Sequence, residues 1–129
     1  MKNYKIFIPA VLWFFVVLIL ICLPGSAFPK HSPFLEKIYF DKWVHAGMFG
    51  LLTLLWLFPL IKIILNKNLA LQWAYKICTA LVVWGITTEF IQKFFIVNRA
   101  FDIWDWAADS FGVLCAFIIW KKIRYQSAL

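Results

Sequence analysis

The sequence is poor in acidic residues, and it lacks the short motifs that would identify a reaction directly. Its 129 residues include only 6 Asp and Glu, against 13 Lys and Arg. No GxSxG, HExxH or P-loop pattern occurs, so none of the reaction classes that these motifs mark is indicated. No internal repeat is visible either, which disfavours a transporter built from two similar halves.

The three cysteines are too scattered to form a recognisable redox or metal motif. Cys22, Cys78 and Cys115 include no CxxC pair, and each lies in or beside an apolar run. A free cysteine in such surroundings behaves as a small hydrophobic residue. We therefore expect no disulfide and no cysteine-bound metal.

The net charge of +7 does not indicate a nucleic-acid partner. The basic residues form no dense patch with stacking aromatics between them. They separate apolar runs instead, which is how membrane proteins use Lys and Arg. We expect no nucleic acid among the partners.

What the chain does have is apolar residues, which make up 64% of it, with aromatics at 20%. A soluble domain of this length has too little interior to bury so much apolar surface. Uniformly apolar runs predict helices rather than the alternating strands of a barrel.

The sequence predicts an all-α membrane protein, a bundle of four transmembrane helices in a single domain over residues 1–129. The predicted spans are residues 6–23, 43–61, 72–94 and 103–120. We read the first as a retained helix because it exceeds the usual signal-peptide core of about 7–15 residues.

The basic residues beside the short loops predict that both chain ends lie inside the cell. With that orientation the inner side has eight of them: Lys2, Lys5, Lys62, Lys67, Lys76, Lys121, Lys122 and Arg124. The outer side has five: Lys30, Lys37, Lys42, Lys93 and Arg99. All six acids fall on the outer side or in the outer part of a span: Glu36, Asp41, Glu89, Asp102, Asp105 and Asp109. The chemistry is therefore expected at the outer face.

Helical spacing gathers the polar residues of three spans into a candidate site. It groups Asp41 with His45, Glu89 with Gln92, and Asp102 with Asp105 and Asp109. An ionised side chain inside a bilayer costs from about 2.5 to more than 10 kcal/mol. Three helices that carry such groups at similar depth are therefore expected to meet in a polar pocket that opens outward.

Simpler roles stay open for several of these residues. Asp41 and Asp102 each stand where an aspartate could cap a helix. His45 alone could be an interfacial histidine. The tryptophans Trp43, Trp104, Trp106 and Trp120 are expected in the interfacial belts, and Gly85 and Gly112 at close helix contacts.

Five elements between Phe40 and Phe117 resemble those of the VanZ-like family of small bacterial membrane proteins. They are a D-K-x-x-H opening at Asp41–His45, an E-x-x-Q element at Glu89–Gln92, Arg99 in the next loop, Asp105, and Asp109 followed by Gly112. Two positions depart from the family pattern. Val97 and Asn98 stand where Pro-Gly is usual, and Asp109 stands where Asn is frequent.

The resemblance implies a protein of the bacterial cell envelope, in the cytoplasmic membrane with its active face outward. The founding member of the family is associated with resistance to the antibiotic teicoplanin, a glycopeptide, and a relation to enzymes that modify lipid head groups has been suggested. Resistance is not transferred to this chain by resemblance.

The first hypothesis is therefore a transferase or hydrolase that acts on a lipid head group or a lipid-linked envelope precursor. His45, Glu89 and Asp105 are the predicted catalytic residues. The predicted substrate-binding residues are Asp41, Lys42, Gln92, Arg99, Asp102 and Asp109. Glu89 and Asp109 are an alternative site for a divalent cation. A non-catalytic protein that binds a lipid head group, a glycopeptide or an envelope partner is the second hypothesis, and a transporter or proton relay is the third.

Overall fold

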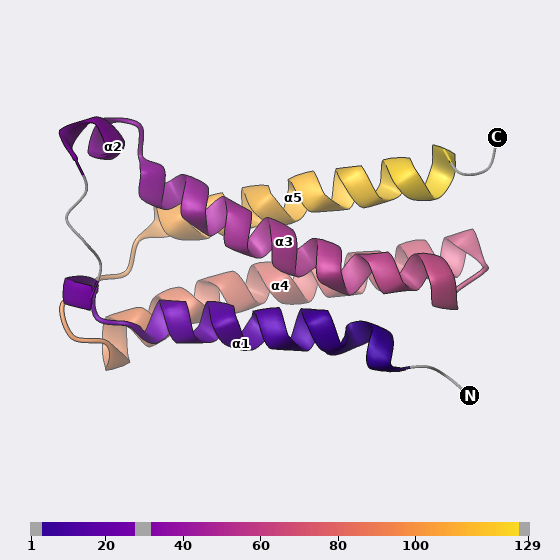
Figure 1. Ribbon diagram of the computed structural model, residues 1–129, viewed down its shortest axis with the longest axis horizontal. Helices are drawn as coiled ribbons and strands as arrows, with labels where there is room; N and C mark the ends of the chain where they lie inside the picture. Colours follow the sequence, from indigo (N-terminus) through magenta and orange to yellow (C-terminus); the bar gives the residue numbers. More distant parts are fainter. Residues whose placement is uncertain (1–3, 28–31, 127–129) are drawn as a thin grey trace.

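The computed structural model describes residues 4–27 and 32–126, which form helices and no β-strand (Figure 1). In chain order these are η1 Tyr4–Phe7, α1 Ile8–Cys22, η2 Gly25–Ala27, α2 Pro33–Lys37, α3 Phe40–Ile63, α4 Lys67–Phe95 and α5 Ile103–Gln126. Four segments are long and apolar enough to cross a membrane: Tyr4–Cys22, α3, α4 and α5. The predicted fold class, an all-α membrane protein with four spans, is confirmed.

Three of the helices continue beyond the apolar runs that predicted them. The helix α3 includes Lys62, α4 begins at Lys67, and α5 continues through Lys121 and Lys122. Hydropathy detects the apolar part of a helix, whereas backbone hydrogen bonds continue into polar residues at the membrane surface. The number and position of the spans were therefore predictable, and their full lengths were not.

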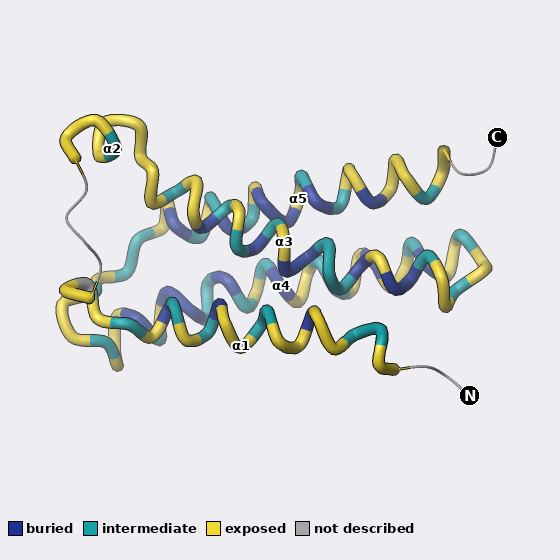
Figure 2. The backbone as a smooth tube through the Cα atoms, viewed as in Figure 1, coloured by how far each residue is buried: buried dark blue, intermediate teal, exposed yellow. Residues whose placement is uncertain are grey.

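The four long helices run alternately up and down, so α3 and α5, which are separated in the chain by α4, run in the same direction (Figure 1). The helix η1 and the end of α5 lie at one end of the bundle, and the α4–α5 connection lies at the other. We call the latter the loop end. The helices α3, α4 and α5 all contact one another, while α1 packs on α3 and α4. Buried residues follow the inner sides of these helices (Figure 2).

The closest helix contact is made by small residues of α3 and α5. A Cβ atom on Gly112 would lie 2.1 Å from the carbonyl oxygen of Ala46, which no side chain could tolerate. Gly50 faces the backbone of Gly112 in turn, its ideal Cβ 3.4 Å from that residue's oxygen. Such contacts between small residues let helix backbones approach closely in membranes. The prediction for Gly112 is confirmed, and this contact sets the register of α3 against α5.

The tryptophans do not all lie where the belt prediction puts them. Trp120 is fully buried beside Leu57 and Ala74, so its assignment to the belt was wrong. Trp106 is partly buried, and its indole Nε1 donates to the carbonyl oxygen of Val82 at 3.0 Å. Trp43 and Trp104 remain exposed. Position near a span end did not distinguish these cases, because it does not show which side of the helix faces the bundle.

The short helix α2 lies between the first two predicted spans and was not among the predicted helices. Ser32 caps it by accepting a 3.4 Å hydrogen bond from the Leu35 N–H, and Pro33 stands at its first position. Serine followed by proline is a helix-start signal that could have identified it. Tyr39 then turns the chain into α3 in a left-handed conformation, φ 53°.

Candidate functional site

The site lies near the loop end of the bundle, where α3, α4 and α5 each contribute acidic or basic side chains. On α3, the i, i+3 spacing puts Lys42 and His45 on the side that faces α5. On α5, the i, i+4 spacing does the same for Asp105 and Asp109. Because α3 and α5 run in the same direction, each residue of one pair meets a partner in the other. Helix α4 brings Glu89 to the same place.

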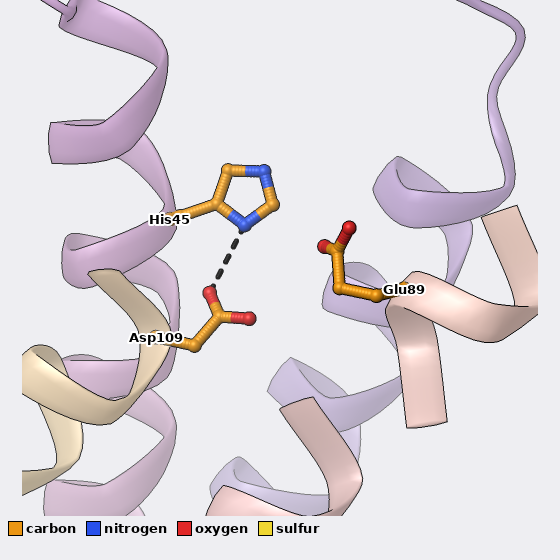
Figure 3. A group of neighbouring side chains, drawn as sticks. All are labelled: His45, Glu89 and Asp109. Atoms are coloured by element: carbon orange, nitrogen blue, oxygen red, sulfur yellow. Dashed lines mark hydrogen bonds and ion pairs between the residues drawn. The ribbon is translucent and has the colours of Figure 1, made fainter. Parts of the chain in front are cut away.

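His45 is held between two aspartates of α5. Its Nδ1 lies 3.0 Å from Oδ1 of Asp109 (Figure 3). Its Nε2 lies 3.7 Å from Oδ2 of Asp105. An ionised carboxylate can only accept, so when Asp109 is ionised this contact requires the ring proton on Nδ1. The 3.7 Å between Nε2 and Asp105 is too long for a hydrogen bond, so Nε2 makes no hydrogen bond among the described residues.

Glu89 completes a three-residue cluster with His45 and Asp109. Each of the three offers one ligand atom, and these atoms all lie within 4.8 Å of one another. The Glu89 carboxylate points toward the other two side chains (Figure 3). Its Oε2 accepts a 3.0 Å hydrogen bond from the backbone N–H of Asp102. Helical spacing, together with the cost of placing ionised groups at similar depth in a bilayer, predicted this meeting of α3, α4 and α5.

Lys42 links the site to its acidic surroundings. Its Nζ lies 2.5 Å from an oxygen of Asp102, 2.5 Å from one of Asp105 and 3.0 Å from one of Asp41. An ammonium group has three donors, so each has a carboxylate partner here. These contacts place Lys42 between Asp41 of α3 and the two aspartates Asp102 and Asp105. Its predicted role in substrate binding stays a prediction.

The two capping alternatives are resolved differently. Asp102 precedes α5 and accepts a 2.8 Å hydrogen bond from the Trp104 N–H, so it caps that helix while it also binds Lys42. Burial raises the pKa of Asp102, but the hydrogen bonds from Lys42 and Trp104 outweigh it and hold the pKa below its usual range. Asp41 caps nothing, because α3 has Tyr39 at its N-cap position and no side-chain cap.

Exposure falls steadily along these side chains from the surface inward. It is 52% for Asp41, 39% for Asp102, 11% for both His45 and Asp105, and 0% for Asp109. Two oxygens at the inner end are buried without a hydrogen-bond partner among the described residues, Oε1 of Glu89 and Oδ2 of Asp109. We call these residues the polar column: Asp41, Lys42, His45, Glu89, Asp102, Asp105 and Asp109. It is exposed at the end where Asp41 and Asp102 lie, its outer end, and buried at the end where Glu89 and Asp109 lie, its inner end.

The two remaining predicted residues are Gln92 and Arg99. Gln92 is buried, and its Nε2 donates to the carbonyl oxygen of Ile21 at 3.4 Å, which ties α4 to the end of α1. Arg99 is partly buried in the connection between α4 and α5 and interacts with its surroundings. Their predicted roles in substrate binding stay predictions.

Gly85 lies at a close contact between α4 and α5, as predicted, but its place in the site was not predicted. A Cβ atom on Gly85 would lie 3.3 Å from Oδ2 of Asp109, so the glycine makes room for that carboxylate. Its spacing of four residues from Glu89 is the signal that could have revealed this. The backbone N–H of Asp102, which binds Glu89, had no sequence signal, because loop backbone geometry cannot be read from side-chain spacing.

A large cavity lies away from this chemistry. It has a volume of about 980 Å³ and lies between η1, α3 and α4, lined mainly by apolar side chains such as Phe7, Trp56, Leu60 and Trp73. In a membrane such a groove contacts lipid chains. We take the polar column as the functional site because it alone combines titratable groups with buried, unpartnered oxygens among the described residues.

The residues that carry the family resemblance lie at the loop end. At the first departure, Asn98 has φ 60°, the left-handed conformation that glycine adopts most easily and asparagine tolerates. Comparison with protein-family models, with curated proteins and with solved structures finds no match for this chain. Membership of the VanZ-like family stays a prediction.

Proposed function

We propose that the chain is a VanZ-like enzyme of the bacterial cell envelope that transfers or hydrolyses the phosphate-bearing head group of a membrane lipid or a lipid-linked precursor. The site faces outward from the cytoplasmic membrane in this proposal. The observation that carries it is the buried pair of His45 and Asp109, 3.0 Å apart, at the inner end of a polar column.

The pair matches the arrangement that catalytic histidines use. A carboxylate behind Nδ1 fixes the tautomer and supports the charge that the ring gains, which leaves Nε2 to take a proton from a reacting hydroxyl or water. His45 keeps 11% of its side chain accessible, whereas Asp109 keeps none. In this proposal His45 is the catalytic base and Asp109 its positioning residue.

One basic group near the site suits a phosphate-bearing substrate. Arg99, in the loop at the same end, supplies a planar guanidinium of the kind that binds phosphate oxygens with two hydrogen bonds. Asp105 is the acidic neighbour of Nε2, at 3.7 Å, and receives or returns the proton during turnover. A substrate anchored in the bilayer brings its head group to this depth without leaving the membrane.

The test replaces His45 with glutamine, which keeps a similar size but cannot transfer the proton. We expect His45→Gln to reduce the turnover of the cellular lipid about 10²–10⁴-fold, measured by mass spectrometry of total lipid extracts from cells with and without the protein. His31→Gln, the same chemical change at the second histidine, is the matched control. A folded His45→Gln variant with full activity would remove the catalytic assignment and favour a non-catalytic binding protein.

A further inference from the structure

We infer that Glu89 and Asp109 bind one hard divalent cation of the Mg²⁺ or Mn²⁺ type, with His45 behind Asp109 as a hydrogen-bond donor and not as a ligand. The cation docks the phosphate of the substrate. The inference rests on the proposed function only for that phosphate, and the cation site itself can be tested without a substrate.

The first observation is the pair of unpartnered oxygens. Glu89 and Asp109 are both fully buried, yet Oε1 of Glu89 and Oδ2 of Asp109 have no hydrogen-bond partner in the described part of the chain. A buried carboxylate without compensation costs several kcal/mol. The other oxygen of each group is occupied, by the Asp102 N–H and by the His45 ring. Each residue therefore has one carboxylate oxygen that accepts no hydrogen bond from the described residues and is free to bind a cation.

The second observation is the spacing. The ligand atoms of His45, Glu89 and Asp109 lie within 4.8 Å of one another, and their side chains converge from three different helices (Figure 3). Two oxygens at about 2.1 Å from one Mg²⁺ lie about 4.2 Å apart at most, which is close to the 4.8 Å limit of this cluster. Gly85 keeps the space beside Oδ2 of Asp109 open.

The donor set selects the class of cation. Mg²⁺ is commonly held by one or two carboxylates, with water and substrate phosphate at the remaining positions. Zn²⁺ prefers nitrogen and sulfur ligands. Nδ1 of His45 already donates to Oδ1 of Asp109, and donors of this kind orient a metal-binding carboxylate. Nε2 stays available as the base.

The experiment titrates the purified full-length protein, washed free of metal in detergent, with Mn²⁺ and counts bound ions by loss of the free Mn²⁺ signal in electron paramagnetic resonance. We expect one Mn²⁺ per chain, displaced by Mg²⁺. Glu89→Gln and Asp109→Asn should each abolish binding up to about 1 mM, the weak end of protein cation sites. His45→Gln should weaken it about 10–100-fold, and Glu36→Gln, an exposed acid at the same end, should not change it.

The result that overturns the inference is a folded wild-type protein with no Mn²⁺ bound at that concentration, or a Glu89→Gln variant that binds as well as wild type. Folding is followed by circular dichroism and size exclusion, and Glu89→Gln alone decides if Asp109→Asn does not fold. A site that prefers Zn²⁺ and needs His45 as strongly as Glu89 also overturns it, because His45 would then be a ligand. If the protein binds Mn²⁺ but His45→Gln leaves lipid turnover unchanged, the cation site is supported and the proposed catalysis is contradicted. If His45→Gln abolishes lipid turnover but no Mn²⁺ binds, the catalysis is supported and the cation site is contradicted.

Discussion

His45 is flanked by two aspartates whose different exposure gives the site a direction. Asp109, which contacts Nδ1, is fully buried, whereas Asp105, which lies near Nε2, has the same side-chain exposure as His45, 11%. In the proposed mechanism, a proton taken up at Nε2 would leave toward the exposed side, past Asp105 and the carboxylates that surround Lys42. At the residue scale, the gradient of exposure therefore favours exchange with the end of the column where Asp41 and Asp102 lie.

Lys42 is the residue whose loss should disturb this column most. Removing its ammonium leaves Asp102 and Asp105 close together without a counter-charge, and Asp102 is held ionised by it. We expect Lys42→Met to lower the free energy of unfolding by about 1–3 kcal/mol, less than for a fully buried pair because Lys42 is partly exposed. Thermal unfolding in detergent measures it.

The same experiment has an internal check. Adding Asp105→Asn to Lys42→Met removes one of the unpaired charges, so the double variant should be more stable than Lys42→Met alone. Lys37→Met, an exposed lysine of α2, is the matched control and should change stability by less than about 0.5 kcal/mol. A Lys42→Met protein as stable as wild type would show that the three ion pairs contribute nothing to folding.

At the element scale, the contact between α3 and α5 determines the geometry of the site. The backbone of Gly112 lies against Ala46. Ala46 is the residue after His45 in α3, and Gly112 is the third residue after Asp109 in α5. Any increase in this helix separation therefore moves His45 away from Asp109 at once. The register of the column depends on a contact in which no charged group takes part.

Gly112→Ala tests this dependence. A Cβ 2.1 Å from the Ala46 oxygen must push the helices apart, so we expect a loss of about 1–3 kcal/mol in the free energy of unfolding, together with loss of lipid turnover. Gly47→Ala is the control, because its Cβ would meet nothing within 4 Å and alanine favours the helix by up to about 1 kcal/mol. Equal stability and activity of the two variants would contradict the proposed role of the contact.

The sequence predicted the helices and the meeting of their polar faces because both follow from short-range periodicity. Asp105 and Asp109 repeat at helical spacing, so their common side could be read directly, whereas the spacing grouped His45 with Asp41 and not with Lys42. The same reasoning failed for Trp120, because near the end of a span an aromatic residue suits the bundle interior and the interface equally well. It also failed for the N–H of Asp102, because a hydrogen bond between a loop backbone and Glu89 depends on tertiary structure that no local pattern encodes.

At the scale of the whole molecule, charge divides the bundle into two unlike ends. The end with η1 and the end of α5 carries seven described basic residues: Lys5, Lys62, Lys67, Lys76, Lys121, Lys122 and Arg124. The loop end carries four, Lys37, Lys42, Lys93 and Arg99, with all six acids of the chain. Arg124 also donates to the carbonyl oxygens of Ile61, Ile64 and Leu65, which holds α5 against the end of α3.

This asymmetry predicts the orientation in the membrane. Basic residues near span ends are retained on the cytoplasmic side, so the η1 end should lie inside and the polar column should open outward. Ser26→Cys in η2 and Gln126→Cys at the end of α5 are both exposed and lie at opposite ends. In a background with Cys22, Cys78 and Cys115 replaced by alanine, an impermeant thiol reagent added to intact cells should label Ser26→Cys, and should label Gln126→Cys only after permeabilisation. Labelling of Gln126→Cys alone would reverse the orientation, and it would place the column on the side where the proposed outer-face substrate cannot reach it.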